Sequence, residues 1–123
     1  MLQPLAIVCY ERLMPGSQLV NRLQDLNYRV LALNQADRLV ATVQRESPLL
    51  LFVDLATAGD ICGTIAMLKS TPATAHVPVI GFAPDNAPGL LAEAQTAGAN
   101  LSVSETAIIS HLSQLIDQAL HVD

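Results

Sequence analysis

Apolar residues gather in five short runs separated by amphipathic stretches, and this alternation indicates the fold class. Short apolar runs are typical of strands, whereas apolar residues spaced three or four positions apart are typical of helices. The apolar runs are Leu5 to Cys9, Tyr28 to Leu33, Leu49 to Asp54, Val77 to Phe82 and Leu101 to Val103. Helical spacing follows each run. Five successive βα units predict an α/β domain with a doubly wound, five-stranded parallel sheet and right-handed crossovers.

Polar side chains and glycine mark where the expected helices begin and end. The first helix is expected from about Ser17, and Gly98 is expected to end the fourth helix in a left-handed conformation. Short polar side chains at a helix start accept a backbone N–H and so cap it. The expected caps of the second, third, fourth and last helices are Asn34, Asp60, either Asp85 or Asn86, and Ser104.

Length, charge and cysteine content narrow the class of protein. The 123 residues fit a single domain, residues 1–123, and carry 11 acidic against 6 basic side chains. A net charge of −5 argues against a nucleic-acid partner, which needs a basic surface. No apolar run approaches the roughly 20 residues of a membrane span, and no signal-peptide pattern opens the chain. Two cysteines suggest neither a disulfide framework nor a zinc site. We therefore expect a cytoplasmic protein without a membrane or nucleic-acid partner.

The third apolar run ends in a carboxylate, Asp54. A strand that is apolar on both faces suits the centre of a parallel sheet covered by helices on both sides. Open α/β sheets place their ligand and reaction sites at the carboxyl ends of such strands, so Asp54 is a candidate for chemistry. The simpler alternative is an Asx turn, in which Asp54 accepts a backbone N–H from Ala56 or Thr57. The sequence leaves both interpretations open.

Four sequence segments show a family resemblance that covers nearly the whole chain. They read LNYRVLAL at 26–33, LLLFVDL at 49–55, HVPVIGF at 76–82 and AGANLSV at 97–103. With the order and lengths of the elements, they resemble the receiver domain of bacterial two-component response regulators. The resemblance implies a flavodoxin-like fold with strand order 2-1-3-4-5. It also implies a histidine kinase or an output domain as the protein partner, and Asp54 as the phosphoacceptor.

The Mg²⁺ site of the family is only partly present. Two acids after the first strand normally hold the metal, whereas this chain has Tyr10 with either Cys9 or Glu11 there. Asp54 and Glu11 therefore form, at best, a weak metal-binding pair, and no other cofactor is expected. A cysteine nucleophile is disfavoured too, because the segment up to Gly16 offers only that glycine and Arg12 instead of a glycine-rich anion cradle. We expect Cys9 to be a buried, small apolar residue.

Three further positions depart from the family pattern. The hydroxyl residue after the fourth strand corresponds to Ala83, and the switch aromatic of the fifth strand corresponds to Ser102. The family's lysine corresponds to Glu105, a charge reversal; two like charges ~4 Å apart cost about 4 kcal/mol at an effective dielectric near 20. Glu105 also suits the first turn of a helix, where a negative charge is favourable. The resemblance is thus to a degenerate, or pseudo-, receiver.

The expected last helix carries more apolar residues than one buried face needs. Its inward stripe is Ile108, Leu112, Leu115 and Ala119, and Ile109, Ile116 and Leu120 widen it. The wide arc would suit homodimerisation or docking on a partner, while simple burial is the alternative.

Three hypotheses for the function follow. The first is a non-enzymatic receiver-like module that acts by protein–protein contact, largely without phosphorylation. The second is a working phospho-receiver in which Asp54 accepts the phosphoryl group with Mg²⁺. The third is a small-molecule-binding, flavodoxin-like domain that uses the crevice beside Asp54.

Overall fold

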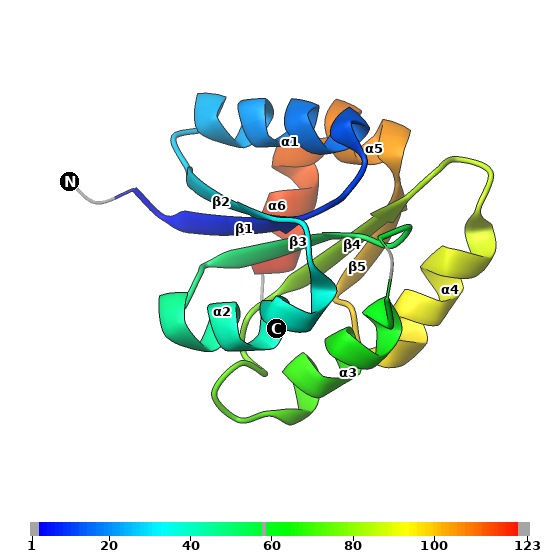
Figure 1. Cartoon of the computed structure of the whole chain (residues 1–123). Coiled ribbons are helices and arrows are strands. Elements are labelled where there is room, and N and C mark those ends of the chain that lie inside the picture. Colours follow the sequence, from blue (N-terminus) through cyan, green and yellow to red (C-terminus); the bar gives the residue numbers. More distant parts are fainter. Residues whose placement is uncertain (1–2, 58, 121–123) are drawn as a thin grey trace.

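The computed structural model of the chain describes residues 3–57 and 59–120 and contains one five-stranded parallel sheet. The strand order is β2-β1-β3-β4-β5, with β3 at the centre (Figure 1). The strands are β1 (Leu5–Cys9), β2 (Arg29–Leu33), β3 (Leu50–Asp54), β4 (Val79–Ala83) and β5 (Leu101–Ser104). The expected fold class and strand order are confirmed.

Helices cover both faces of the sheet (Figure 1). On one face lie α1 (Leu13–Asp25), α5 (Glu105–Ser110) and α6 (Leu112–Leu120). On the other lie a 3₁₀ turn η1 (Ala36–Arg38), α2 (Leu39–Glu46), α3 (Ile61–Ser70) and α4 (Pro88–Ala97). Successive residues of β3 alternate between the two cores, with Phe52 packed towards α1 and Val53 towards α3. Every residue of β1, β3 and β4 is buried, which is why their sequences are apolar apart from Asp54 at the end of β3.

Three of the predicted helix ends are confirmed. The Asp60 carboxylate accepts the Gly63 N–H at 3.0 Å and caps α3. The Ser104 hydroxyl accepts the Ala107 N–H at 3.2 Å and caps α5. Gly98 ends α4 with φ 117°, a conformation that L side chains rarely adopt.

Two predicted caps are wrong. Asn34 caps no helix, because a 3₁₀ turn comes first and α2 begins only after Arg38, without a side-chain cap. Neither Asp85 nor Asn86 caps α4; that helix opens with Pro88, which has no N–H to satisfy in the first turn. The Asp85 carboxylate is engaged elsewhere, at the start of α5.

The first and last helices also differ from expectation. Helix α1 spans Leu13–Asp25, but Met14 has an extended backbone (φ −116°, ψ 130°) and a cis peptide bond joins it to Pro15, so the regular helix starts two positions before the expected Ser17. The expected last helix is two helices, α5 and α6, separated at His111.

Burial accounts for much of the wide apolar arc on α5 and α6. Ile116 is only 5% exposed, within the core beneath these helices. Ile109 and Leu120 are partly buried against the same core. Ile116 is therefore not available to a partner.

Candidate functional site

Asp54 ends the central strand, where the sequence predicted it, and its side chain is fully buried. A buried carboxylate is stable only when hydrogen bonds or an opposite charge replace the water it has lost. The partners of its two oxygens therefore determine what the site can do.

The opposite charge comes from Arg12, in the loop between β1 and α1. Its Nε donates to Oδ2 of Asp54 at 2.8 Å and its Nη2 donates to Oδ1 at 2.9 Å. Arg12 has an extended backbone (φ −75°, ψ 127°) just before α1, and its side chain reaches the end of β3. Two parallel bonds between guanidinium and carboxylate form the strong, directional type of ion pair.

A third hydrogen bond reaches Asp54 from its own loop. The Ala56 N–H donates to Oδ1 at 3.0 Å, and the Thr57 N–H donates to the Asp54 backbone carbonyl at 3.0 Å. The Asx-turn interpretation is thus confirmed for Ala56. Both carboxylate oxygens are occupied, and Oδ1 accepts two bonds.

Glu105 shares the same guanidinium. Nη1 of Arg12 donates to Oε2 of Glu105 at 3.1 Å, and about a third of each of these two side chains is exposed. The hydrogen bond from Arg12 to Asp54 is the main reason that the pKa of Arg12 is raised. The Glu105 carboxylate thus lies beside a cation, and the Asp54–Arg12–Glu105 triad joins the ends of β3 and β5 to the β1–α1 loop.

The other predicted site residues have structural contacts. Ala83, at the end of β4, is fully buried in the core towards α2 and α3. The Ser102 hydroxyl donates to the Leu91 carbonyl at 2.8 Å and so ties β5 to α4. The Tyr10 ring packs so closely on Gly16 of α1 that a Cβ there would overlap it.

The residues at this edge do not fit a magnesium ion as they are arranged. The Asp54 oxygens face a guanidinium, and Glu11 lines hollows with Asn34 and Gln35 beyond the ends of β1 and β2. Over residues 3–57 and 59–120, no three His, Cys, Asp or Glu side chains come together as a metal site. Arg12 supplies the positive charge next to Asp54.

Cys9 lies fully buried at the end of β1, as expected. Burial, with smaller contributions from the negative charges of Asp54 and Glu11, raises the pKa of its thiol to about 11. A thiol with this pKa stays protonated at neutral pH and is a poor nucleophile.

Two residues make contacts at this edge of the sheet that the sequence analysis did not predict. Arg12 was visible only as a lone base in a loop, and its partners lie 42 and 93 positions away. Asp85, in the β4–α4 loop, accepts both the backbone N–H and the hydroxyl of Thr106 at the start of α5. These hydrogen bonds lower the pKa of Asp85, the hydroxyl bond contributing most. No local pattern signals either contact.

Comparisons with known proteins agree on the architecture. No protein-family model matches the sequence, and no curated protein does. Among solved structures, the receiver domain of NtrX from Brucella abortus superposes with a TM-score of 0.83 at 17% identity, covering 96% of this chain and 99% of that one. The chain has the receiver fold.

Two further solved structures support the same assignment. A response regulator from Desulfuromonas acetoxidans matches with a TM-score of 0.77 at 19% identity, over 97% of each chain. The signal receiver domain of a modulated diguanylate cyclase from Desulfovibrio desulfuricans G20 matches with a TM-score of 0.80 at 20% identity, over 97% of this chain and 94% of that one. Likeness at such low identity establishes the receiver fold and leaves the activity to be argued from the site.

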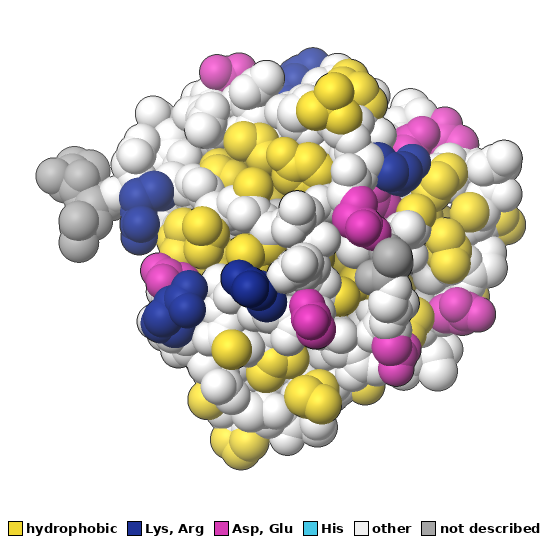
Figure 2. All heavy atoms as spheres, viewed as in Figure 1, with side chains coloured by type: hydrophobic (Ala, Val, Ile, Leu, Met, Phe, Trp, Pro, Cys, Tyr) yellow, Lys and Arg dark blue, Asp and Glu magenta, His cyan; other side chains and the backbone are white. Residues whose placement is uncertain are grey.

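The described residues can be compared with the expectation that the chain binds neither a membrane nor nucleic acid. Within residues 3–57 and 59–120, no helix is long and apolar enough to cross a membrane. On the face drawn in Figure 2, basic side chains stand among acidic ones instead of forming a continuous stripe. Nucleic-acid binding relies on such a stripe or patch, so this face gives it no support.

Proposed function

We propose that this chain is a non-enzymatic, receiver-like signalling module that acts by protein–protein contact without depending on phosphorylation of Asp54. The observation that carries the proposal is the engagement of both Asp54 oxygens by Arg12, with Ala56 as a further donor. A nucleophilic carboxylate must present a free oxygen to the incoming phosphorus. Here that oxygen would first have to leave a bidentate ion pair.

The charges around Asp54 also oppose a phosphoryl group. The triad holds two carboxylates and one guanidinium, so its net charge is about −1 when all three groups are ionised. A phosphorylated Asp54 would bring further negative charge towards Glu105 and compete with it for Arg12. Ala83 offers no hydroxyl to stabilise the added oxygens.

The receiver fold supports a proposal for the class of partner. Structures with the receiver fold include a response regulator and a receiver domain of a diguanylate cyclase. We infer that the partner is a histidine kinase or an output domain, in a reducing cytoplasm where Cys9 and Cys62 remain free thiols.

A small-molecule site finds little support at this edge. The hollow of about 430 Å³ beyond β1 and β2 is lined mainly by polar or exposed side chains, including Glu11, Asn34, Gln35 and Arg38. Ligand pockets are usually deep and mostly apolar, with a few polar groups that fix orientation.

Amide NMR spectra recorded during titration with Mg²⁺, and then with beryllium fluoride, test the proposal. We expect the Asp54, Ala56 and Thr57 signals to stay in place up to millimolar Mg²⁺. Acetyl phosphate should leave the intact mass unchanged. Mg²⁺-dependent shifts or a phosphoryl adduct that vanish in Asp54→Asn would sink the proposal and revive the phospho-receiver hypothesis.

A set of variants tests which residues prevent phosphorylation of Asp54. Ala83→Thr with Glu105→Lys restores the family's residue types, and adding Arg12→Ala removes the guanidinium. If Arg12 is the main block, the triple variant should gain acetyl-phosphate labelling that the double variant lacks. Arg45→Ala, which removes an exposed arginine paired with Glu46, is the matched control.

A further inference from the structure

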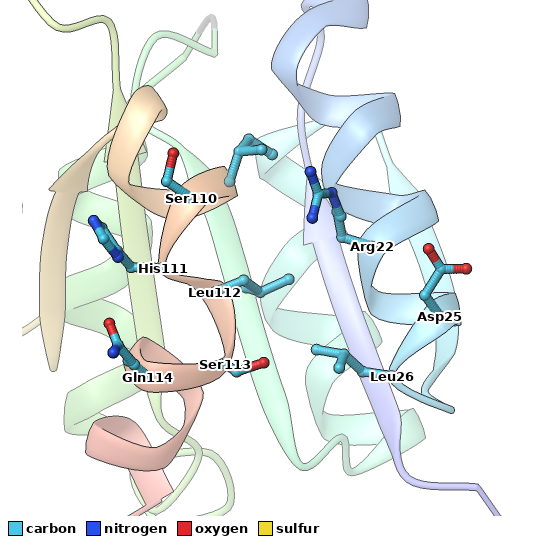
Figure 3. Close-up of a pocket in the computed structure, with 9 residues that line it drawn as sticks. Arg22, Asp25, Leu26, Ser110, His111, Leu112, Ser113 and Gln114 are labelled. Atoms are coloured by element: carbon cyan, nitrogen blue, oxygen red, sulfur yellow. The ribbon is translucent and has the colours of Figure 1, made fainter.

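A groove runs between α1 and the α5–α6 pair, and one end of it reaches Glu105 of the triad. It consists of two hollows, of about 320 and 360 Å³, that share Ile109 and Ser110. Figure 3 shows the second hollow, with Leu26 at the end of α1 and Leu112 of α6 pointing towards each other across it. The first hollow continues the groove to the start of α1, beside Glu105.

The α1 side of the groove is a ridge of four residues spaced four apart: Met14, Gln18, Arg22 and Leu26. Residues at this spacing share one face of a helix. Met14 precedes the regular helix, but its sulfur accepts the Ser17 hydroxyl at 3.7 Å, and it lines the same hollow as Gln18. Met14 is 56% and Leu26 40% exposed, so both ends of the ridge present uncovered apolar surface.

The ridge reads the same in both directions: apolar, polar, polar, apolar. We infer that a second copy of this chain covers the groove, forming a symmetric dimer in which the two α1 helices pack antiparallel. In that arrangement Met14 meets the partner's Leu26, and Gln18 meets the partner's Arg22. The same two contacts occur again across the two-fold axis, as an isologous interface requires.

The polar pair in the middle is chemically complementary. The side-chain oxygen of Gln18 accepts hydrogen bonds, whereas the guanidinium of Arg22 only donates them. The apolar ends have matching recesses. The partner's Met14 would enter the hollow beside Leu26 and Leu112, and the partner's Leu26 the hollow beside Pro15 and Ile109.

This interface differs from the dimer through the last helix expected from the sequence. That expectation relied on Ile109, Ile116 and Leu120, of which Ile116 is buried in the core. Of that set, Ile109 lines the groove, and the contacts that would fix the register of the dimer come from the α1 ridge.

Sedimentation velocity of the whole chain over a concentration series tests the inference. We expect a concentration-dependent dimer, and Met14→Glu or Leu26→Glu should each weaken its Kd by about tenfold or more because a buried apolar contact becomes a charge. Met67→Glu is the control, since Met67 is 55% exposed on α3, across the sheet from the groove. Circular dichroism verifies that each variant is folded.

A charge-swap series tests the register. Gln18→Arg alone places arginine opposite arginine and should dissociate the dimer, while Arg22→Gln alone should weaken it. The double variant with both changes restores the Gln–Arg pairs in reverse, and the dimer should return. A wild-type monomer up to about 1 mM overturns the inference, as does a dimer indifferent to both glutamate variants or a double variant that stays monomeric. No phosphoryl reagent is involved, so failure here is distinguishable from failure of the proposed function.

Discussion

The guanidinium of Arg12 and the carboxylate of Asp54 form two parallel hydrogen bonds, of 2.8 and 2.9 Å, that join the β1–α1 loop to the end of the central strand. Asp54 is fully buried, whereas a third of the Arg12 side chain is exposed. The carboxylate is thus shielded from water by the residue that neutralises it. Arg12 has a structural role as well as an electrostatic one, because Asp54 would otherwise be a buried, unpaired charge.

Removing Arg12 should therefore destabilise the fold. Arg12→Ala is expected to lower the free energy of unfolding by about 2–3 kcal/mol, below the cost for a fully buried pair because Arg12 is partly solvated. Arg12→Lys keeps the charge but cannot form the bidentate contact. Its decrease in the free energy of unfolding should therefore be intermediate. Urea denaturation followed by circular dichroism measures the differences.

Arg45→Ala is the control, since the Arg45–Glu46 pair is exposed on α2 and should contribute less than about 1 kcal/mol. Equal losses for Arg12→Ala and Arg45→Ala would contradict a structural role for the Asp54 pair.

The sequence predicted the sheet better than the site, for a physical reason. Strands such as Leu50–Asp54 are apolar up to their last residue because both faces are buried, and this signal is local. The contact between Arg12 and Asp54 joins residues 42 positions apart and depends on the backbone of one loop, which periodicity does not encode. Asn34 failed as a cap for a related reason. It has the right side chain, but the chain first forms a 3₁₀ turn, and the helix begins after Arg38.

Gly16 should not tolerate a side chain. A Cβ at this position would overlap the ring of Tyr10, which packs against the core beneath α1. Gly16→Ala is expected to cost about 1–3 kcal/mol, because the ring or the start of α1 must move. Gly89→Ala is the matched control: its Cβ would meet nothing within 4 Å, and alanine favours the helix by up to about 1 kcal/mol. Thermal unfolding should show a lower Tm for the first variant only; a drop for Gly89→Ala alone would refute this explanation.

The two cysteines should differ in reactivity. Cys9 is fully buried and its pKa is raised to about 11, whereas Cys62 is partly exposed on α3. At pH 8, iodoacetamide should modify one thiol per folded chain and two in urea, as counted by intact mass. In Cys62→Ser, labelling of the folded protein should be lost. Rapid labelling of Cys9 in the folded variant would show that the end of β1 opens to solvent.

Asp85 should make stability depend on pH in the acid range. Its pKa is lowered, chiefly because its carboxylate accepts the Thr106 hydroxyl, so the folded state binds the proton less tightly than the unfolded chain. The resulting stabilisation is complete above the ordinary Asp value of about 3.9 and disappears as the pH falls through the folded-state pKa. Asp85→Asn should therefore be less stable than wild type at pH 6, and the gap should narrow on acidification. Denaturation at a series of pH values measures the difference in stability, and a ¹³C titration of the Asp85 carboxyl checks its origin.

Thr106→Val, which removes the hydroxyl alone, should move the Asp85 carboxyl pKa back towards its ordinary value. If the Asp85 carboxyl of the wild type already titrates at that value, the bond to Thr106 does not link the β4–α4 loop to α5 in solution.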